Sequence, residues 1–220
     1  MEAAKDGNVN VLEWTRKHDF VPTTRMFQKA AANGHVSVFE WAEAKDFKPW
    51  NSDRIFLSAI SNERIHLMEW LVERRNAPRR SVALAAELGK INVLRWLKER
   101  DLIGSKIHHN IWYDTAYGGH VDVLEFLHTN GYNVPPASVV RGGVDGNQME
   151  VLEWTRDNSV GWDESFCAYA ASVGNLHALQ WLRENNCPWN GRVISEANRQ
   201  GHVHIVEWSI ANGCPRLVHM

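Results

Sequence analysis

The sequence predicts an all-α fold, a curved solenoid of stacked helix–turn–helix repeats. First, the segment 7–14 returns seven more times, with small changes, along the 220-residue chain. Second, the apolar residues before and after the start of each copy follow the three-to-four-residue spacing of a buried helix face. Third, glycine or asparagine separates the two apolar stretches in most copies, and proline follows the second stretch, as expected where helices end.

We call the first residue of each copy the anchor. The anchors are Gly7, Gly34, Glu63, Gly89, Gly119, Asn147, Gly174 and Gly201, which are 26 to 30 residues apart. A period of about 28 residues is typical of repeat proteins, in which each repeat is one structural unit. We therefore expect a single domain over 1–220. Its repeats are 1–21, which is incomplete, and 22–49, 50–77, 78–105, 106–134, 135–161, 162–188 and 189–220.

The stretch before each anchor has the pattern of a first helix. The residue four positions before the anchor is small in all eight copies: Ala3, Ala30, Ala59, Ala85, Thr115, Gly143, Ala170 and Ala197. The residue seven positions before it is apolar in the seven copies that reach so far: Phe27, Phe56, Val82, Trp112, Val140, Cys167 and Ile194. This spacing predicts one buried helix face. Thr23, Ser52, Asp163 and Asn190 are the expected N-caps.

The stretch after each anchor has the pattern of a second helix with an aromatic column. The column is Trp14, Trp41, Trp70, Trp96, Phe126, Trp154, Trp181 and Trp208. It could form a ligand cage or a platform for nucleobases. Its position on the same stripe as Val93, Leu94 and their equivalents favours burial instead. Trp50, Trp162 and Trp189 fall at repeat boundaries, where we expect them to pack one loop on the next.

The turn residues explain where each helix ends. Glycine at the anchor readily adopts the left-handed conformation that ends a helix, and Asn147 is the next best choice. Glu63 suits this conformation poorly, so we expect a distorted turn there. Residues that tolerate a turn stand twelve positions after the anchor: Asp19, Asp46, Asp101, Gly131, Asn186 and Gly213. Proline follows within a few residues in most repeats, which predicts short loops.

The segment from Ala30 to Trp41, read as A-A-x-x-G-H-x-x-V-[LF]-x-W, resembles the central half of the ankyrin repeat. The resemblance covers nearly the whole chain. The tetrapeptide T-P-L-H is missing, however, and the period is shorter than the ankyrin period of about 33. The resemblance therefore implies short loops in place of most β-hairpin fingers. Copies such as 185–190 look like the divergent, Trp-rich short repeats of giant-virus and protist proteins. A TPR-like α-solenoid is the alternative fold.

Composition limits the function classes. The formal net charge of −2 argues against a general nucleic-acid binder. No apolar run reaches the length of a membrane span, and the first residues lack the apolar core of a signal peptide. Three cysteines with no C-x-x-C spacing indicate reduced thiols and an intracellular, cytoplasmic location, which would be the host cytoplasm for a viral protein. Cys187 and Cys214, at equivalent positions in adjacent repeats, are expected to lie too far apart for a disulfide.

Signatures of chemistry are missing from the sequence. It contains no Walker A motif, no H-E-x-x-H, no G-x-S-x-G and no EF-hand loop. His108, His109 and His120 form the one local histidine cluster, and we expect them to face solvent. We therefore expect no enzyme, no cofactor, no metal and no small-molecule substrate. A column of glutamates from Glu13 to Glu207 is expected to be a solvated outer face or, alternatively, a docking stripe.

The expected function is binding of another protein by a monomeric scaffold through the concave face, because the ankyrin resemblance implies protein–protein recognition. Two alternatives stay open. The chain could be the substrate-recognition part of a ubiquitin-ligase adaptor, although no F-box is visible. It could also bind nucleic acid through a basic patch of Arg74, Arg75, Arg79 and Arg80.

The candidate binding surface is the exposed side of the first helices. An arginine column stands nine residues before four anchors, at the expected second residue of each first helix: Arg25, Arg54, Arg80 and Arg192. Its alternative role is pairing with local carboxylates. Neighbouring exposed positions complete the candidate set: Gln28, Lys29, Leu84, Tyr113, Asp114, Tyr169 and Glu196. Tyr113 and Tyr169 are the expected hot spots, because interface energy concentrates in Tyr, Trp and Arg.

Overall fold

The structure is a computed structural model that describes residues 2–19, 21–48, 52–105 and 108–216. Within these residues it contains sixteen α-helices and no β-strand, which confirms the predicted all-α class. Trp50 lies outside the described residues. None of the described helices is long and apolar enough to cross a membrane.

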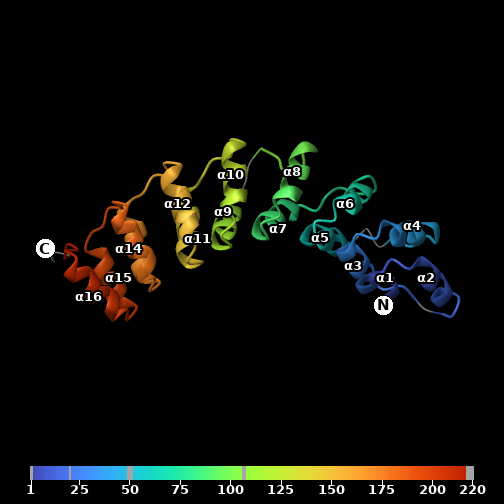
Figure 1. The fold of residues 1–220 in the computed structure, drawn as a ribbon, viewed down its shortest axis with the longest axis horizontal. Coiled ribbons are helices and arrows are strands. Elements are labelled where there is room, and N and C mark those ends of the chain that lie inside the picture. Colours follow the sequence, from blue (N-terminus) through green and yellow to red (C-terminus); the bar gives the residue numbers. More distant parts are fainter. Residues whose placement is uncertain (1, 20, 49–51, 106–107, 217–220) are drawn as a thin grey trace. The chain divides into compact units, whose positions relative to one another are not determined.

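The helices alternate as predicted, one before and one after each anchor (Figure 1). The first helices are α1 (Glu2–Lys5), α3 (Thr24–Asn33), α5 (Asp53–Ser61), α7 (Ser81–Glu87), α9 (His109–Tyr117), α11 (Pro136–Asp145), α13 (Glu164–Ser172) and α15 (Arg192–Arg199). The second helices are α2 (Val9–Arg16), α4 (Val36–Ala44), α6 (Ile65–Val72), α8 (Ile91–Glu99), α10 (Val121–Thr129), α12 (Met149–Asp157), α14 (Leu176–Glu184) and α16 (Val203–Ala211).

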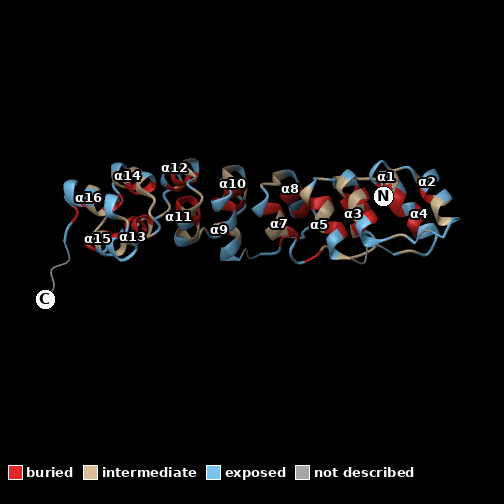
Figure 2. Cartoon of the chain, turned by 90° about the horizontal axis from the view of Figure 1, so that it is seen from below, coloured by how far each residue is buried: buried red, intermediate tan, exposed pale blue. Residues whose placement is uncertain are grey.

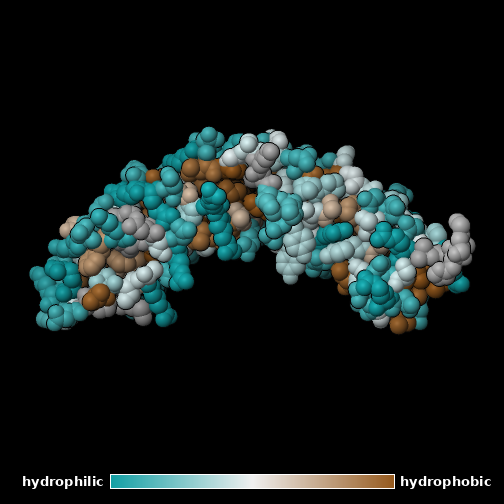
Figure 3. Space-filling model, turned by 180° about the vertical axis from the view of Figure 1, so that it is seen from behind, coloured by the Kyte–Doolittle hydropathy of each residue, from teal (hydrophilic) through white to brown (hydrophobic). Residues whose placement is uncertain are grey.

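The chain divides into two compact units, Met1–Gly104 and Ser105–Met220, which we call unit 1 and unit 2. In unit 1 each first helix packs on the next, α1 on α3, α3 on α5 and α5 on α7. In unit 2, α9 packs on α11, α11 on α13 and α13 on α15. Buried residues lie mainly on the helices, and the loops between pairs are mostly exposed or half-buried (Figure 2). Apolar patches interrupt the hydrophilic surface of each unit (Figure 3).

Each anchor forms the same tight turn. Every anchor has a positive φ, including Asn147 at 52° and Glu63 at 54°. The amide that follows the anchor donates to the carbonyl five residues earlier, as from His35 to Ala30 at 3.1 Å. The distorted turn expected at Glu63 is wrong, because the equivalent bond from Arg64 to Ala59 is intact at 2.9 Å. Lys90 lies 3.2 Å from the Glu63 carboxylate and helps to hold this residue in place.

The side chain after the anchor joins one repeat to the one before it. In five repeats it donates to a carbonyl at the end of the preceding first helix. These bonds run from His35 to Lys5, Arg64 to Ala32, Gln148 to Tyr117, Asn175 to Val144 and His202 to Ser172, at 2.6 to 3.2 Å. The last carbonyls of a helix have no partner within the helix, so these side chains satisfy them. A Cβ at Gly7 would lie 2.6 Å from the His35 ring, so the anchor glycine also provides space for this side chain.

The aromatic column is buried in the middle of the chain and exposed at its start. Trp41, Trp70, Trp96 and Trp154 are buried, and Phe126, Trp181 and Trp208 are half-buried. Trp14 is 62% exposed, so the prediction of burial is wrong there. Helix α2 packs mainly on α1 and α4.

The glutamate column is partly a link between repeats. The Trp41 indole donates to Glu13 at 3.0 Å, and the Trp154 indole donates to Glu125 at 2.8 Å. Each bond joins the second helices of two successive repeats. Two of these glutamates therefore link neighbouring repeats, a role that the predicted solvated face does not include.

The boundary residues also differ in detail from expectation. Trp162 and Trp189 pack edge-on against Trp181 and Trp208 of their own repeats, with ring centroids 5.7 and 5.9 Å apart. All three cysteines are buried and free, which confirms the free thiols. The Cys187 thiol donates to the Asp163 carbonyl at 3.5 Å, which links the loop after α14 to the N-cap of α13.

Candidate functional site

The arginine column lies on the solvent side of the first helices, but its register varies. Arg25 and Arg54 are the second residues of α3 and α5, as predicted. Arg192 is the first residue of α15, and Arg80 precedes α7 as its N-cap, so the prediction is wrong for these two. The reason at Arg80 is a turn, in which the Ser81 amide donates to the Pro78 carbonyl at 2.9 Å and delays the helix.

Local pairing explains only one of the four arginines. Arg80 lies 3.7 Å from Glu87. Arg25, Arg54 and Arg192 are exposed and form no ion pair within the residues that the structure describes. Their charges therefore face solvent.

Three other candidates in unit 1 take part in repeat packing. The Gln28 carbonyl accepts a hydrogen bond from the Ser58 hydroxyl at 3.1 Å, which links α3 to α5. Lys29 lies 3.4 Å from Glu2 of the preceding helix. Leu84 on α7 is half-buried. All three residues are half-buried, so they contribute less to the exposed surface than the arginines do.

In unit 2 the structure brings two predicted hot spots together. The hydroxyls of Tyr113 on α9 and Tyr169 on α13 both donate to the same oxygen, Oδ2 of Asp145 on α11, and each distance is 2.6 Å. We call Tyr113, Asp145 and Tyr169 the tyrosine cluster. Tyr117 stacks on Tyr113, and the Arg141 guanidinium lies 5.0 Å from the Tyr169 ring.

The shared carboxylate keeps both phenols neutral. The hydrogen bond to Asp145 raises the pKa of Tyr113 to about 12, and burial adds to the effect. The pKa of Tyr169 is also raised, first by burial and then by its hydrogen bond to Asp145. Each phenol thus remains a hydrogen-bond donor at neutral pH. Hydrogen bonds to a charged acceptor are stronger than those between neutral groups, so both rings are held in place.

Two glycines allow this arrangement. A Cβ at Gly142 would lie 2.5 Å from the Tyr113 carbonyl oxygen, and one at Gly146 would lie 2.2 Å from the Tyr117 carbonyl oxygen. Only glycine permits helices α9 and α11 to approach so closely. Gly142 and Gly146 are four residues apart on one helix face, and this spacing is the sequence signal that could have revealed the contact. Asp145 was not among the predicted site residues.

The remaining candidates lie outside the tyrosine cluster. Asp114 is exposed on α9, and Arg192 is exposed at the start of α15. Glu196 pairs with Arg199 on its own helix at 2.6 Å. Tyr113 and Tyr169 thus share a hydrogen-bond partner, whereas Asp114, Arg192 and Glu196 form no hydrogen bond with either tyrosine within the described residues.

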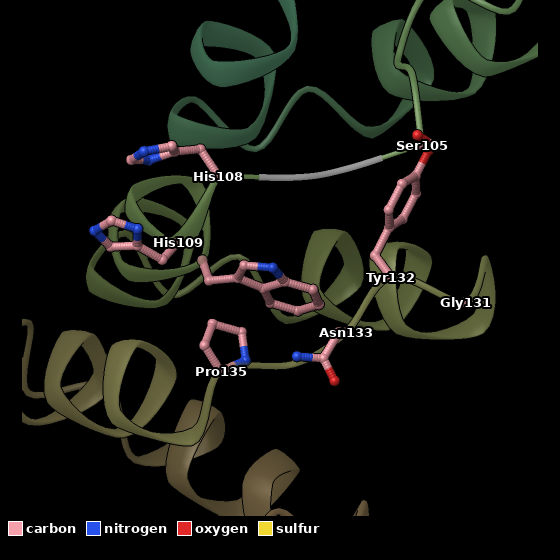
Figure 4. Close-up of a pocket in the computed structure, with 8 residues that line it drawn as sticks. Ser105, His108, His109, Gly131, Tyr132, Asn133 and Pro135 are labelled. Atoms are coloured by element: carbon pink, nitrogen blue, oxygen red, sulfur yellow. The ribbon is translucent and has the colours of Figure 1, made fainter.

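A recess of about 690 Å³ lies elsewhere in unit 2 (Figure 4). His108 and His109 line one side, and Tyr132 and Asn133 line another. The Trp112 indole also lines it, and its N–H is buried with no hydrogen-bond partner among the described residues. The His108 ring accepts a hydrogen bond from the Asn110 amide at 3.4 Å.

The described residues that line this recess include two histidines but no carboxylate, cysteine or lysine. The described residues contain no group of three side chains suited to hold a metal ion. His108 and His109 are exposed as predicted, while His120 is half-buried.

No protein-family model matches the chain, and no curated protein matches it.

Proposed function

We propose that the chain is a non-catalytic scaffold, an ankyrin-like solenoid of helix pairs, that binds a partner protein through the exposed side of its first helices. The tyrosine cluster is the observation that carries this proposal. It places two aromatic side chains from different repeats on one surface and fixes both through a single carboxylate.

The cluster has the chemistry of an interface centre. Tyr and Arg are enriched among the residues that dominate binding energy. Tyr117, which is 53% exposed, and the exposed Arg141 extend the surface around the cluster. Because Tyr113 and Tyr169 are already held by hydrogen bonds, they lose little rotamer freedom when a partner binds, which favours affinity.

We further propose that the protein works in the cytoplasm. Its three cysteines are buried and unpaired, as expected where thiols stay reduced.

The test begins with affinity purification of the protein from its native cell and identification of bound proteins by mass spectrometry. The affinity of the recovered partner is then measured for a Tyr113→Ala and Tyr169→Ala double variant. A hot spot is worth about 2 kcal/mol or more, so we expect a loss of about 30-fold or more.

A Glu150→Ala and Glu153→Ala variant is the matched control, because both residues are exposed on α12, a second helix. Circular dichroism should show that both variants keep their helices. Equal affinity of the tyrosine variant and the natural protein would refute the proposal.

A further inference from the structure

Three arginines repeat on neighbouring first helices of unit 1. Arg25 is the second residue of α3, Arg54 is the second residue of α5, and Arg80 immediately precedes α7. Helix α3 packs on α5, and α5 packs on α7. All three side chains are exposed. We call them the arginine ladder.

Two carboxylates on the first helices of unit 1 are engaged elsewhere, whereas Glu87 lies 3.7 Å from Arg80 of the ladder. Asp53, which adjoins Arg54, pairs with Arg75. Glu2 pairs with Lys29 at 3.4 Å and with Lys5 at 3.5 Å. Consequently neither Arg25 nor Arg54 forms an ion pair within the described part of the chain.

The position of these arginines is locally unfavourable. A cation in the first turn of a helix faces the positive end of the helix dipole. Arg25 is the second residue of α3, whose first turn has no acidic residue, and Arg54 is the second residue of α5, where the adjacent Asp53 pairs with Arg75 instead. No ion pair within the described chain stabilises these two charges, so we attribute them to the recognition of a ligand.

The charge of the chain is unevenly distributed. Unit 1 has seventeen lysines and arginines against fourteen aspartates and glutamates, which gives it a net charge of +3. Unit 2 has seven against twelve, which gives −5. An acidic ligand is thus attracted to unit 1 and repelled by unit 2.

The spacing of the ladder restricts the shape of that ligand. Packed helices lie about 8–10 Å apart, so successive arginines repeat at about this interval. In a polyproline II chain, which has three residues per turn, every third side chain points to the same side and advances about 9 Å. We propose that unit 1 binds an extended acidic segment of a partner protein, with carboxylates at every third residue facing Arg25, Arg54 and Arg80. This inference rests on the proposed function, since it names a partner chemistry for the first-helix side.

A single-stranded nucleic acid fits the same surface less well. Such ligands are held by aromatic side chains that stack on successive bases. The described parts of α3, α5 and α7 carry two aromatic residues, Phe27 and Phe56, and both are buried. The guanidinium group forms paired hydrogen bonds with a carboxylate, so a peptide needs no such platform.

The experiment measures fluorescence anisotropy with two labelled twelve-residue peptides of equal composition. One is four repeats of Glu-Pro-Pro, which places a carboxylate at every third residue of a polyproline II helix. The other has its four glutamates in succession, followed by eight prolines. We expect the spaced peptide to bind about fivefold more tightly, since each exposed ion pair contributes a few tenths to about 1 kcal/mol.

Variants identify the site. An Arg25→Gln and Arg54→Gln variant should lose about fivefold in affinity for the spaced peptide. A Lys17→Gln and Arg95→Gln variant removes the same charge from exposed positions near the second helices and should change affinity less than about twofold. Removing a cation from the start of a helix does not destabilise it, so the first variant should keep its fold.

Three results would each overturn the inference. They are equal binding of the two peptides, an equal loss in both variants, and tighter binding of a twelve-nucleotide oligothymidylate than of the spaced peptide. A failure here is separable from a failure of the proposed function. Partner binding that depends on Tyr113 and Tyr169, without selectivity between the peptides, would refute the acidic segment alone.

Discussion

Gly142→Ala should destabilise the protein, although the same change in most helices does the opposite. Alanine in a helix interior is more favourable than glycine by about 1 kcal/mol. Here the new Cβ would lie 2.5 Å from the Tyr113 carbonyl oxygen and 2.9 Å from the Ala116 Cβ. Ordinary contact begins near 3.4 Å, so α9 and α11 must separate by about 1 Å. Overpacking of this kind costs about 1–3 kcal/mol. We expect a net loss of about 1–2 kcal/mol after the gain in helix propensity.

The loss can be measured by urea unfolding followed by circular dichroism. Gly161→Ala is the control, because a Cβ there meets nothing within 4 Å, and it should be neutral or slightly stabilising. The separation of α9 from α11 should also weaken the hydrogen bond from Tyr113 to Asp145, so the pKa of Tyr113 should fall towards 10. A Gly142→Ala protein that is more stable than the natural one would refute the close-packing argument.

Three further predictions concern single side chains. Trp96→Ala should cost about 3–5 kcal/mol of unfolding free energy, whereas Trp14→Ala should cost much less because Trp14 is exposed; equal shifts in the urea midpoint would contradict the burial pattern. Ultraviolet titration should give Tyr113 a pKa of about 12, and Asp145→Asn should lower this pKa. Because the pKa of Tyr113 is raised in the folded protein, its contribution to the free energy of unfolding is present below pH 10 and is lost as the pH rises through about 12. The pKa of Glu13 is lowered to about 2, chiefly by hydrogen bonds from Arg16 and Trp41. Its contribution to the free energy of unfolding should therefore be present above pH 4.5 and lost as the pH falls through about 2, and Glu13→Gln should remove this dependence of the urea midpoint on pH.

The repeat pattern was sufficient to predict the helices, because each depends on nearby residues. Anchors, caps and apolar spacing act within one or two turns of the chain. The error at Glu63 has a physical cause. The turn is fixed by a backbone hydrogen bond to Ala59, which any residue can make once the neighbouring helices impose the conformation.

The tyrosine cluster could be predicted only in part. Exposed tyrosines on the first helices were recognisable as interface residues, since their position in the repeat is a local property. Their common partner was not, because Asp145 is 32 residues from Tyr113 and 24 from Tyr169. Which carboxylate meets which phenol depends on how closely α9 and α11 approach, and this is decided by Gly142 and Gly146. The repeat pattern gives the order of the helices but not that distance.

The link between repeats described above also has a consequence for sequence comparison. In five repeats the position after the anchor is occupied by histidine, arginine, glutamine or asparagine, each of which donates a hydrogen bond to the preceding first helix. A comparison of residue identities treats this position as variable. In these five repeats its physical role is the same, since the fold uses a hydrogen-bond donor of sufficient reach rather than one residue type. A search that aligned repeats by hydrogen-bonding capacity at this position would recognise related arrays that share few identical residues.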